Sequence, residues 1–256
     1  MRTPAELFDL TGRVAIVTGG SRGIGRAVAE GLATAGADIV IASRKLEACE
    51  KAAKEIEVAT GRRALPVACH VGSWDDCDRL VETVYAEFGK VDVLVNNAGM
   101  SPLYDKLSTV TRELYDKVHA VNASGPFRLS ALVGERMAVG DGGSIINVTT
   151  AGSLRPGPHD IPYAMAKAGL NALTLGLAGE WAPKVRANLV LPGAFDTDIS
   201  KAWGEEAQRR AAEMNPMGRI GVPEDLVGVC VFLASDASGY INGAQILADG
   251  GLFRTL

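Results

Sequence analysis

A tyrosine and a lysine lie four residues apart in the stretch IPYAMAKAGL, positions 161 to 170, among alanines and other residues that favour helices. Residues at this spacing lie on one face of an α-helix, so Tyr163 and Lys167 can act on the same group. A cation about 4 Å away stabilises a phenolate by roughly 4 kcal/mol at an effective dielectric of about 20, and one pKa unit corresponds to about 1.4 kcal/mol. The pair predicts a tyrosine whose pKa is lowered towards neutrality, acting as general acid or base on an oxygen atom. A chance pair on a solvated helix face is the alternative for this motif alone.

A glycine-rich stretch, TGGSRGIG, occupies residues 18 to 25 between a predicted strand and a predicted helix that ends at Gly36. In this interpretation Gly19 permits a tight turn, Gly23 lets backbone amides approach a pyrophosphate, and Gly25 allows the helix to pack closely on the strand. The position after the first strand favours a dinucleotide site over an ordinary glycine-rich turn.

Seven short apolar runs rich in valine and isoleucine alternate with helix-length stretches of Ala, Leu, Glu and Lys. Runs that are apolar throughout suit a parallel sheet buried on both faces, so the sequence predicts a doubly wound α/β Rossmann fold. No linker or composition shift divides the chain, and we expect one domain over residues 1–256. The predicted strands are 14–18, 38–42, 64–68, 91–95, 144–149, 185–191 and 244–248.

The composition is that of a globular protein: 47% of the 256 residues are hydrophobic, 22% are charged, and the net charge is -4. Scattered basic residues argue against a nucleic-acid partner. The N-terminus lacks the apolar core of a signal peptide, and the longest apolar run is too short to cross a bilayer, so we expect a cytoplasmic protein without a membrane partner. The four cysteines lack metal-ligand spacing, which predicts buried thiols and no metal site; they are Cys49, Cys69, Cys77 and Cys230.

Taken together, the motifs resemble those of the short-chain dehydrogenase/reductase family. The glycine motif after the first strand, NNAG at 96–99 after the fourth, and Tyr-x-x-x-Lys in a later helix occur in the family's order. Asn122 in HAVNASGPF, LPGAFDT at 191–197 and SGYINGAQILADGG at 238–251 are similar to further family motifs. The resemblance covers essentially the whole chain.

This resemblance implies NAD(P)-dependent hydride transfer between an alcohol and a ketone or aldehyde. Tyr163 would be the general acid in reduction and the base in oxidation. Lys167 would lower the pKa of Tyr163 and hold the nicotinamide ribose, and Asn122 would help hold a water that links Lys167 to solvent. A helix-interior hydrogen bond is the alternative role for Asn122.

The resemblance also implies a set of cofactor contacts. NNAG would line the adenosine side, although a role in bracing the sheet is a near-equal alternative, and the 192–197 segment would border the nicotinamide. The implied contacts are Gly19, Ser21, Arg22, Gly23, Ile24, Gly25, Asn97, Ala98, Gly99, Pro192, Gly193 and Thr197, besides Tyr163 and Lys167.

Two positions depart from the family pattern. Thr150 stands where the family usually has a serine that holds the substrate oxygen; its hydroxyl can donate the same hydrogen bond, but its methyl group stiffens and crowds the site. Ser153 is a less favoured candidate for that role, and Thr149 is expected to face away. His70 replaces a common aspartate near adenine, so only Val71, through its backbone, is expected to contact the cofactor there.

Cofactor choice is indicated at the end of the second strand, in IASRK. A site for NAD usually has an acid there, whereas a site for NADP provides cations for the 2′-phosphate. Ser43 occupies the position of the acid, with Arg44 beside it and Arg22 in the glycine loop. Two arginines can bind a phosphate through charge-assisted hydrogen bonds, so we predict NADP(H), with solvated surface arginines as the alternative.

The substrate is expected to be a carbonyl or alcohol under a lid at about 195–220, which carries the apolar residues Phe195, Ile199, Trp203, Met214 and Met217. Leu154, Arg155 and His159 would border the pocket. A medium-sized apolar ketone fits this description, with a 3-oxoacyl thioester first by analogy. Binding of a phosphate-bearing carrier is one interpretation of Arg155, Arg209 and Arg210, and solvated surface arginines are the favoured one.

The sequence also indicates how the protein assembles, and it leaves open an alternative to an enzyme. The helix that begins near residue 161 is lined by small residues, which predicts another helix packed on it and hence a homodimer or homotetramer, with a fully buried monomeric helix as the alternative. Because of Thr150, an NADP-binding sensor or scaffold with weak catalysis is the alternative to an enzyme. The sequence has no G-x-S-x-G motif, which argues against a hydrolase.

Overall fold

The structure is a computed structural model that describes residues 1–201 and 204–253, without the side chains of Ile199 and Lys201. Seven parallel strands form one sheet in the order β3-β2-β1-β4-β5-β6-β7. This is the predicted doubly wound Rossmann-type arrangement, in which the strand order reverses between β1 and β4. The strands are β1 Val14–Thr18, β2 Asp38–Ser43, β3 Ala64–Ala68, β4 Val93–Asn96, β5 Gly143–Val148, β6 Val185–Pro192 and β7 Gln245–Ala248.

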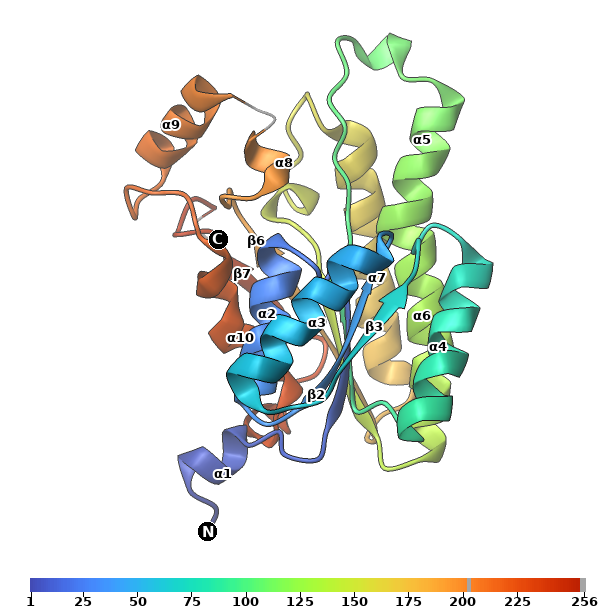
Figure 1. Ribbon diagram of the computed structural model, residues 1–256. Helices are drawn as coiled ribbons and strands as arrows, with labels where there is room; N and C mark the ends of the chain where they lie inside the picture. Colours follow the sequence, from blue (N-terminus) through green and yellow to red (C-terminus); the bar gives the residue numbers. More distant parts are fainter. Residues whose placement is uncertain (202–203, 254–256) are drawn as a thin grey trace.

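The helices cover both faces of the sheet and its upper edge (Figure 1). The α-helices are α1 Pro4–Phe8, α2 Gly23–Thr34, α3 Leu46–Thr60, α4 Trp74–Phe88, α5 Arg112–His119, α6 Gly125–Val139, α7 Ile161–Glu180, α8 Asp198–Lys201, α9 Glu205–Met214 and α10 Val227–Ala234. A π-helical turn, η2 Ala120–Ser124, joins α5 to α6. The 3₁₀ turns are η1 Leu107–Thr109, η3 Ala151–Ser153, η4 Pro223–Leu226 and η5 Asp236–Ser238.

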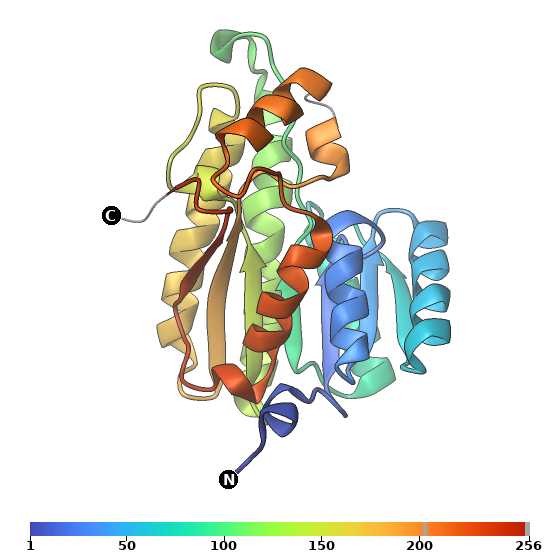
Figure 2. The ribbon, with the colours of Figure 1, turned by 90° about the vertical axis from the view of Figure 1, so that its left-hand side faces the viewer.

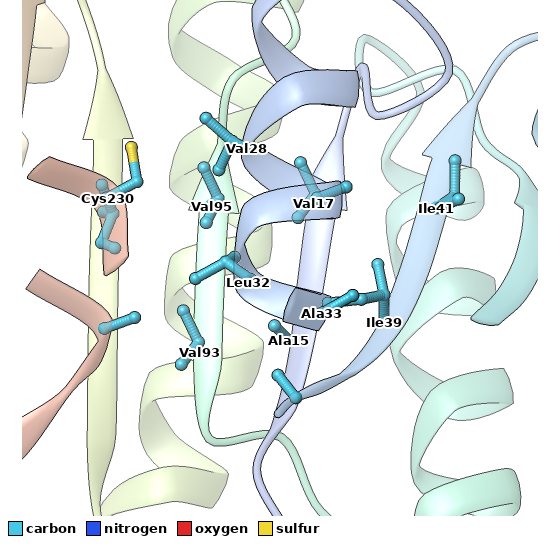
Figure 3. Close-up of a cluster of buried hydrophobic side chains, with 14 of the residues drawn as sticks. Ala15, Val17, Val28, Leu32, Ala33, Ile39, Ile41, Val93, Val95 and Cys230 are labelled. Atoms are coloured by element: carbon cyan, nitrogen blue, oxygen red, sulfur yellow. The ribbon is translucent and has the colours of Figure 1, made fainter. Parts of the chain in front are cut away.

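The strands β1, β2, β4, β5 and β6 are buried on both faces because alternate side chains enter different cores, whereas the edge strands β3 and β7 are partly exposed. In β1, Ala15 and Val17 pack with α2, α3 and α10, whereas Val14 and Ile16 pack with α4, α6 and α7. Figure 3 shows the first of these cores, where Val28, Leu32 and Ala33 of α2 lie over β1, β2 and β4. This explains why the strand sequences are apolar throughout, as predicted.

The carboxyl ends of the parallel strands meet at one edge of the sheet. The loops that follow β1, β4, β5 and β6 all leave from this edge, and α5, α8 and α9 rise above it (Figures 1 and 2). Helix α2, which follows the glycine-rich stretch, begins at Gly23 and ends at Thr34, two residues before the predicted Gly36, which takes a φ of 110° and reverses the chain. Ligands bind at this edge in open α/β sheets, and the predicted site residues lie on it.

Candidate active site and cofactor cradle

The glycine loop is held against the loop that follows β4. Gly19 has a φ of 67°, which favours glycine, and a Cβ atom at Gly25 would lie 2.3 Å from the Gly19 carbonyl oxygen and 2.4 Å from Asn97 Nδ2. Side chains at these positions would fill the space between the two loops. Gly19 thus forms a tight turn, Gly25 packs the start of α2 against the loops after β1 and β4, and Gly23, with a φ of 54°, begins α2.

Thr18, which the sequence analysis did not single out, joins the two loops. Its hydroxyl oxygen accepts hydrogen bonds from the backbone N–H groups of Asn97 and Ala98, at 3.0 and 3.1 Å. The side chain of Asn97 donates to the Thr18 carbonyl oxygen at 2.9 Å. The NNAG turn thus braces the sheet, as the alternative interpretation had it. A threonine that ends the strand before a glycine loop was the signal available in the sequence.

The end of β2 carries hydroxyl groups instead of an acid. The Ser43 and Ser21 hydroxyl oxygens lie 2.9 Å apart, and the Cys49 thiol lies 3.1 Å from Ser43. Arg44 is exposed beside them. Arg22 forms an ion pair with Asp198 of α8 at 2.8 Å, so its guanidinium links the glycine loop to the lid segment.

The remaining predicted cofactor contacts lie around the same edge. Val71 is buried, and its carbonyl oxygen would clash at 1.9 Å with a Cβ atom at Gly125, the first residue of α6. Ile24 packs partly against the core below the glycine loop. Pro192 ends β6, Gly193 lies against Asp249, and the Thr197 N–H donates to Ser200 Oγ at 2.9 Å.

The predicted pair Tyr163 and Lys167 lies in the first turns of α7. Lys167 is 2% exposed, its Nζ donates to the carbonyl oxygen of Val148 at 2.8 Å, and it lies 5.9 Å from the centroid of the Tyr163 ring. Burial lowers the pKa of Lys167 to about 7. The lysine therefore faces the end of β5 and the tyrosine at once.

Burial, and next the charge of Asp160, raise the pKa of the Tyr163 phenol. The predicted lowering of this pKa by Lys167 is thus wrong for the protein chain taken by itself. The physical reason is that burial disfavours both charged forms, the phenolate and the ammonium. Tyr163 is held as a neutral phenol, which suits a proton donor.

Asn122 lies in the π-helical turn and is fully buried. Its Nδ2 donates to the carbonyl oxygens of Val118 and Met100, both at 2.9 Å, and its Oδ1 accepts from the Met100 N–H at 3.1 Å. A Cβ atom at Gly99 would lie 3.0 Å from Asn122 Oδ1 and 3.6 Å from Lys167 Nζ. Asn122, Gly99 and Lys167 therefore meet at one point, and the side chain of Asn122 also fixes the loop after β4.

The Thr150 hydroxyl oxygen accepts a hydrogen bond from the Gly152 N–H at 3.2 Å, which leaves its own proton available to a substrate oxygen. Thr149 is buried, and its hydroxyl has no partner among the described residues. The Ser153 hydroxyl donates a hydrogen bond to the Thr150 carbonyl oxygen at 2.6 Å and accepts one from Asn171 Nδ2 at 2.8 Å. The Ser153 proton is therefore engaged and Thr149 is buried, whereas Thr150 is partly exposed and keeps its proton free to donate.

A small pocket lies beside the Tyr163 side chain. Tyr104 closes one side, because its hydroxyl donates to the Pro158 carbonyl oxygen at 3.0 Å and accepts from the Ile161 N–H at 3.2 Å. Asp160, the N-cap residue of α7, is the acid of this pocket, and burial raises its pKa. The sequence analysis missed Asp160, Tyr104 and the following lining residues: Pro102, Leu114, Val118 and Pro162.

The segment predicted to be a lid, 195–220, contains α8 and α9. Met214 and Met217 are exposed there, but Phe195 is buried in the core and bridges to Gly221, so its place in a lid was wrong. Trp203 lies outside the described residues, as does the Ile199 side chain.

The arginines near the pocket have partners of their own. Arg209 and Arg210 pair with glutamates of their own helix, as the surface interpretation expected. Arg155 lies 5.8 Å from the Phe253 ring, while Leu154 and His159 are exposed. No helix in the described part of the chain is long and apolar enough to cross a membrane.

The sequence matches known oxidoreductases along its length. A family model described as enoyl-(acyl carrier protein) reductase matches residues 19–253. The chain is 42% identical to 2-dehydro-3-deoxy-D-gluconate 5-dehydrogenase of Pseudoalteromonas atlantica, covering 96% of this chain and 98% of that protein. It is 40% identical to L-rhamnose 1-dehydrogenase (NAD(P)(+)) of Azotobacter vinelandii, covering 96% and 99%.

Solved structures show the same fold. A gluconate 5-dehydrogenase from Burkholderia cenocepacia, in complex with NADP and tartrate, superposes with a TM-score of 0.93 at 33% identity. That comparison covers 99% of this chain and 100% of the other.

Proposed function

The chain belongs to the short-chain dehydrogenase/reductase family of oxidoreductases, and from this premise we propose that it is an NADP(H)-dependent enzyme that interconverts a secondary alcohol and a ketone. The observation that carries the proposal is the meeting of Lys167 Nζ, Asn122 and Gly99 beside the Tyr163 phenol. Tyr163 donates its proton to the carbonyl oxygen in reduction, and Thr150 donates a hydrogen bond to the same oxygen. Lys167 and Asn122 then connect Tyr163 to solvent, from which the phenol regains its proton.

The cradle fits a dinucleotide. Gly19 and Gly25 let the glycine loop pack closely on the loop after β4, and the N-terminus of α2 favours a phosphate. When bound, NADP(H) supplies or accepts the hydride. Ser43, Arg44 and Arg22 are the residues for the 2′-phosphate, since a serine stands where an acid would repel it. A related enzyme crystallised with NADP supports this preference.

The substrate is proposed to be a sugar or sugar acid. Two enzymes about 40% identical to this chain are named for such substrates, and a structural neighbour is named a gluconate dehydrogenase. The 3-oxoacyl thioester remains the second candidate, favoured by the apolar lining that Leu114, Val118 and Pro162 give to the pocket. A sensor or scaffold would bind NADPH without turnover.

The oligomeric state and the cellular location of the protein are also proposals. Exposed small residues, together with Met165 and Leu175, give α7 an outer surface that a second copy can cover, which supports a homodimer or homotetramer. The exposed small residues are Ala168, Gly169, Ala172, Gly176 and Gly179. Light scattering after size exclusion measures the assembly. A cytoplasmic location is proposed on the sequence argument already given.

The deciding experiment follows NADPH at 340 nm in both directions with D-gluconate, L-rhamnose, 2-hydroxycyclohexanone, cyclohexanone and acetoacetyl-CoA. Tyr163→Phe serves as the variant, because it keeps the ring and removes the proton. Turnover by the wild type that is lost in Tyr163→Phe supports the enzyme, and the substrate that responds identifies the class. NADPH binding without turnover of any substrate favours the sensor.

A further inference from the structure

The carboxyl group of Asp160 is arranged unusually for its position. Aspartate at the N-cap of a helix normally accepts a hydrogen bond from the helix's own backbone N–H groups. Asp160 is the N-cap residue of α7, yet its side chain makes no capping bond. The acid has been turned away from the helix that it begins.

The carboxyl group points instead into the turns that precede α7. A Cβ atom at Gly152 would lie 3.5 Å from Asp160 Oδ2, and one at Gly157 would lie 3.6 Å from Oδ1. Thr150 Oγ1 lies at the same 3.5 Å from the Gly152 position, so Asp160 and the Thr150 hydroxyl flank one glycine. The acid is thereby placed on the Thr150 side of the site.

One oxygen of this acid lacks a partner. Asp160 Oδ1 is buried and has no hydrogen-bond partner of ordinary geometry among the described residues, although the backbone N–H groups of Gly157 and of Asp160 itself lie near enough to the carboxyl group to oppose the rise in its pKa that burial causes. A buried acceptor without a partner costs stability, so such a group in a folded protein requires an explanation. A ligand that donates a hydrogen bond provides one.

The pocket narrows what that ligand is. Asp160 and Tyr163 both line it, four of its other residues are apolar, and the Tyr104 hydroxyl is engaged by the backbone. A molecule that reaches Tyr163 with its reacting oxygen therefore meets one further polar side chain, an acceptor. Resting on the proposed alcohol and ketone chemistry, we propose that Asp160 is a specificity-determining residue that accepts a hydrogen bond from a second hydroxyl group of the substrate, near the reacting carbon.

This assigns the substrate to the hydroxy-ketones and polyols. A substrate with only methylene groups beside its carbonyl offers no hydrogen-bond donor to Asp160 Oδ1, and a site built to bind a hydroxyl discriminates strongly against such a molecule. A substrate carboxylate is expected away from Asp160, because two like charges in one pocket repel.

The test uses two ketones that differ by one hydroxyl group, 2-hydroxycyclohexanone and cyclohexanone. The quantity measured is the ratio of kcat/KM for the first to that for the second, with NADPH. The wild type is expected to favour the hydroxylated ketone, and Asp160→Ala to lower the ratio ten- to hundredfold. Asp160→Asn retains an acceptor oxygen and should keep more of the ratio. Asp141→Ala, which removes an exposed acid before β5, is the matched control.

A ratio that is the same in wild type and Asp160→Ala would overturn the proposal, even if both rates fall together. If the wild type reduces neither ketone, the proposed function fails by itself, and binding decides the inference. Saturation-transfer NMR would then compare cis-cyclohexane-1,2-diol with cyclohexanol. Preferential binding of the diol that Asp160→Ala abolishes supports the role of Asp160, whereas equal binding contradicts it.

Discussion

The ammonium nitrogen of Lys167 lies 2.8 Å from the carbonyl oxygen of Val148, so α7, the helix that carries Tyr163 and Lys167, is bonded to the end of the central strand β5. Lys167 is buried in forming this bond, and its pKa falls from 10.5 to about 7. The same side chain therefore serves the site and weakens the fold at neutral pH.

Lys167→Met is expected to change how stability depends on pH. Between about pH 7 and 10.5 the unfolded chain holds a proton that folded Lys167 has lost, so wild-type stability rises with pH across this window. The slope is at most about 1.4 kcal/mol per pH unit for one group. Urea unfolding at several pH values measures it. Lys167→Met should lose this contribution and exposed Lys45→Met should keep it; identical slopes for wild type and Lys167→Met would contradict the assignment.

Asp160→Asn is expected to shift the pH profile of alcohol oxidation. The negative charge of Asp160 raises the pKa of Tyr163, so its removal lowers that pKa and the phenolate base forms at lower pH. The limb of the kcat/KM profile on which activity rises with pH should therefore move to lower pH, towards neutrality. Asp141→Asn provides the control, and a shift in the opposite direction would rule the explanation out.

Thr150→Val tests the hydrogen bond to the substrate oxygen. Valine keeps the shape but lacks the donor, and we expect kcat to fall ten- to a thousandfold, while Thr150→Ser remains active. Thr149→Val is the matched control, because that hydroxyl is buried without a partner among the described residues and its loss should leave kcat intact. An active Thr150→Val would show that another group donates the hydrogen bond to the substrate oxygen.

Ser43→Asp is expected to reverse cofactor preference. A carboxylate at the end of β2 repels the 2′-phosphate of NADPH and accepts hydrogen bonds from the ribose hydroxyls of NADH. The ratio of kcat/KM with NADPH to that with NADH should fall at least tenfold, and Arg44→Ala should lower it in the same direction. Lys45→Ala is the neighbouring control. A ratio that Ser43→Asp leaves unaltered would place the phosphate elsewhere.

Gly25→Ala is expected to weaken NADPH binding, even though alanine favours helices more than glycine does. Its Cβ atom would lie 2.3 Å from the Gly19 carbonyl oxygen, which belongs to the backbone and cannot swing aside. NADPH binding, followed by fluorescence, is expected to weaken at least tenfold. Gly228→Ala, in an exposed part of α10 with nothing within 4 Å, should instead stabilise the protein by about 0.5–1 kcal/mol. Normal NADPH binding by Gly25→Ala would show that the loop opens.

The sequence predicted what local patterns determine. The seven strands were predicted to within two residues at each end, because each is apolar on both faces, and Gly19 and Gly25 follow from backbone geometry alone. Asp160 could not be predicted in this way. An aspartate before a helix indicates a cap, and only the packing of distant turns diverts its side chain.

The pKa of Tyr163 shows the same limit. Spacing places Lys167 near the phenol, but the sign of the shift depends on burial by residues from several elements. The role of Thr18 likewise depends on β4 lying beside β1.

The π-helical turn at Ala120–Ser124 has a consequence for how this protein can diversify. One extra residue in a helical turn rotates everything before it by about 100° relative to everything after it. Here the turn lets α6 present Leu129 and Val133 to the sheet while α5 presents Leu114 and Val118 to the pocket. The pocket-facing half of this long helix can therefore accumulate mutations under selection for a new ligand, without altering the half on which folding depends.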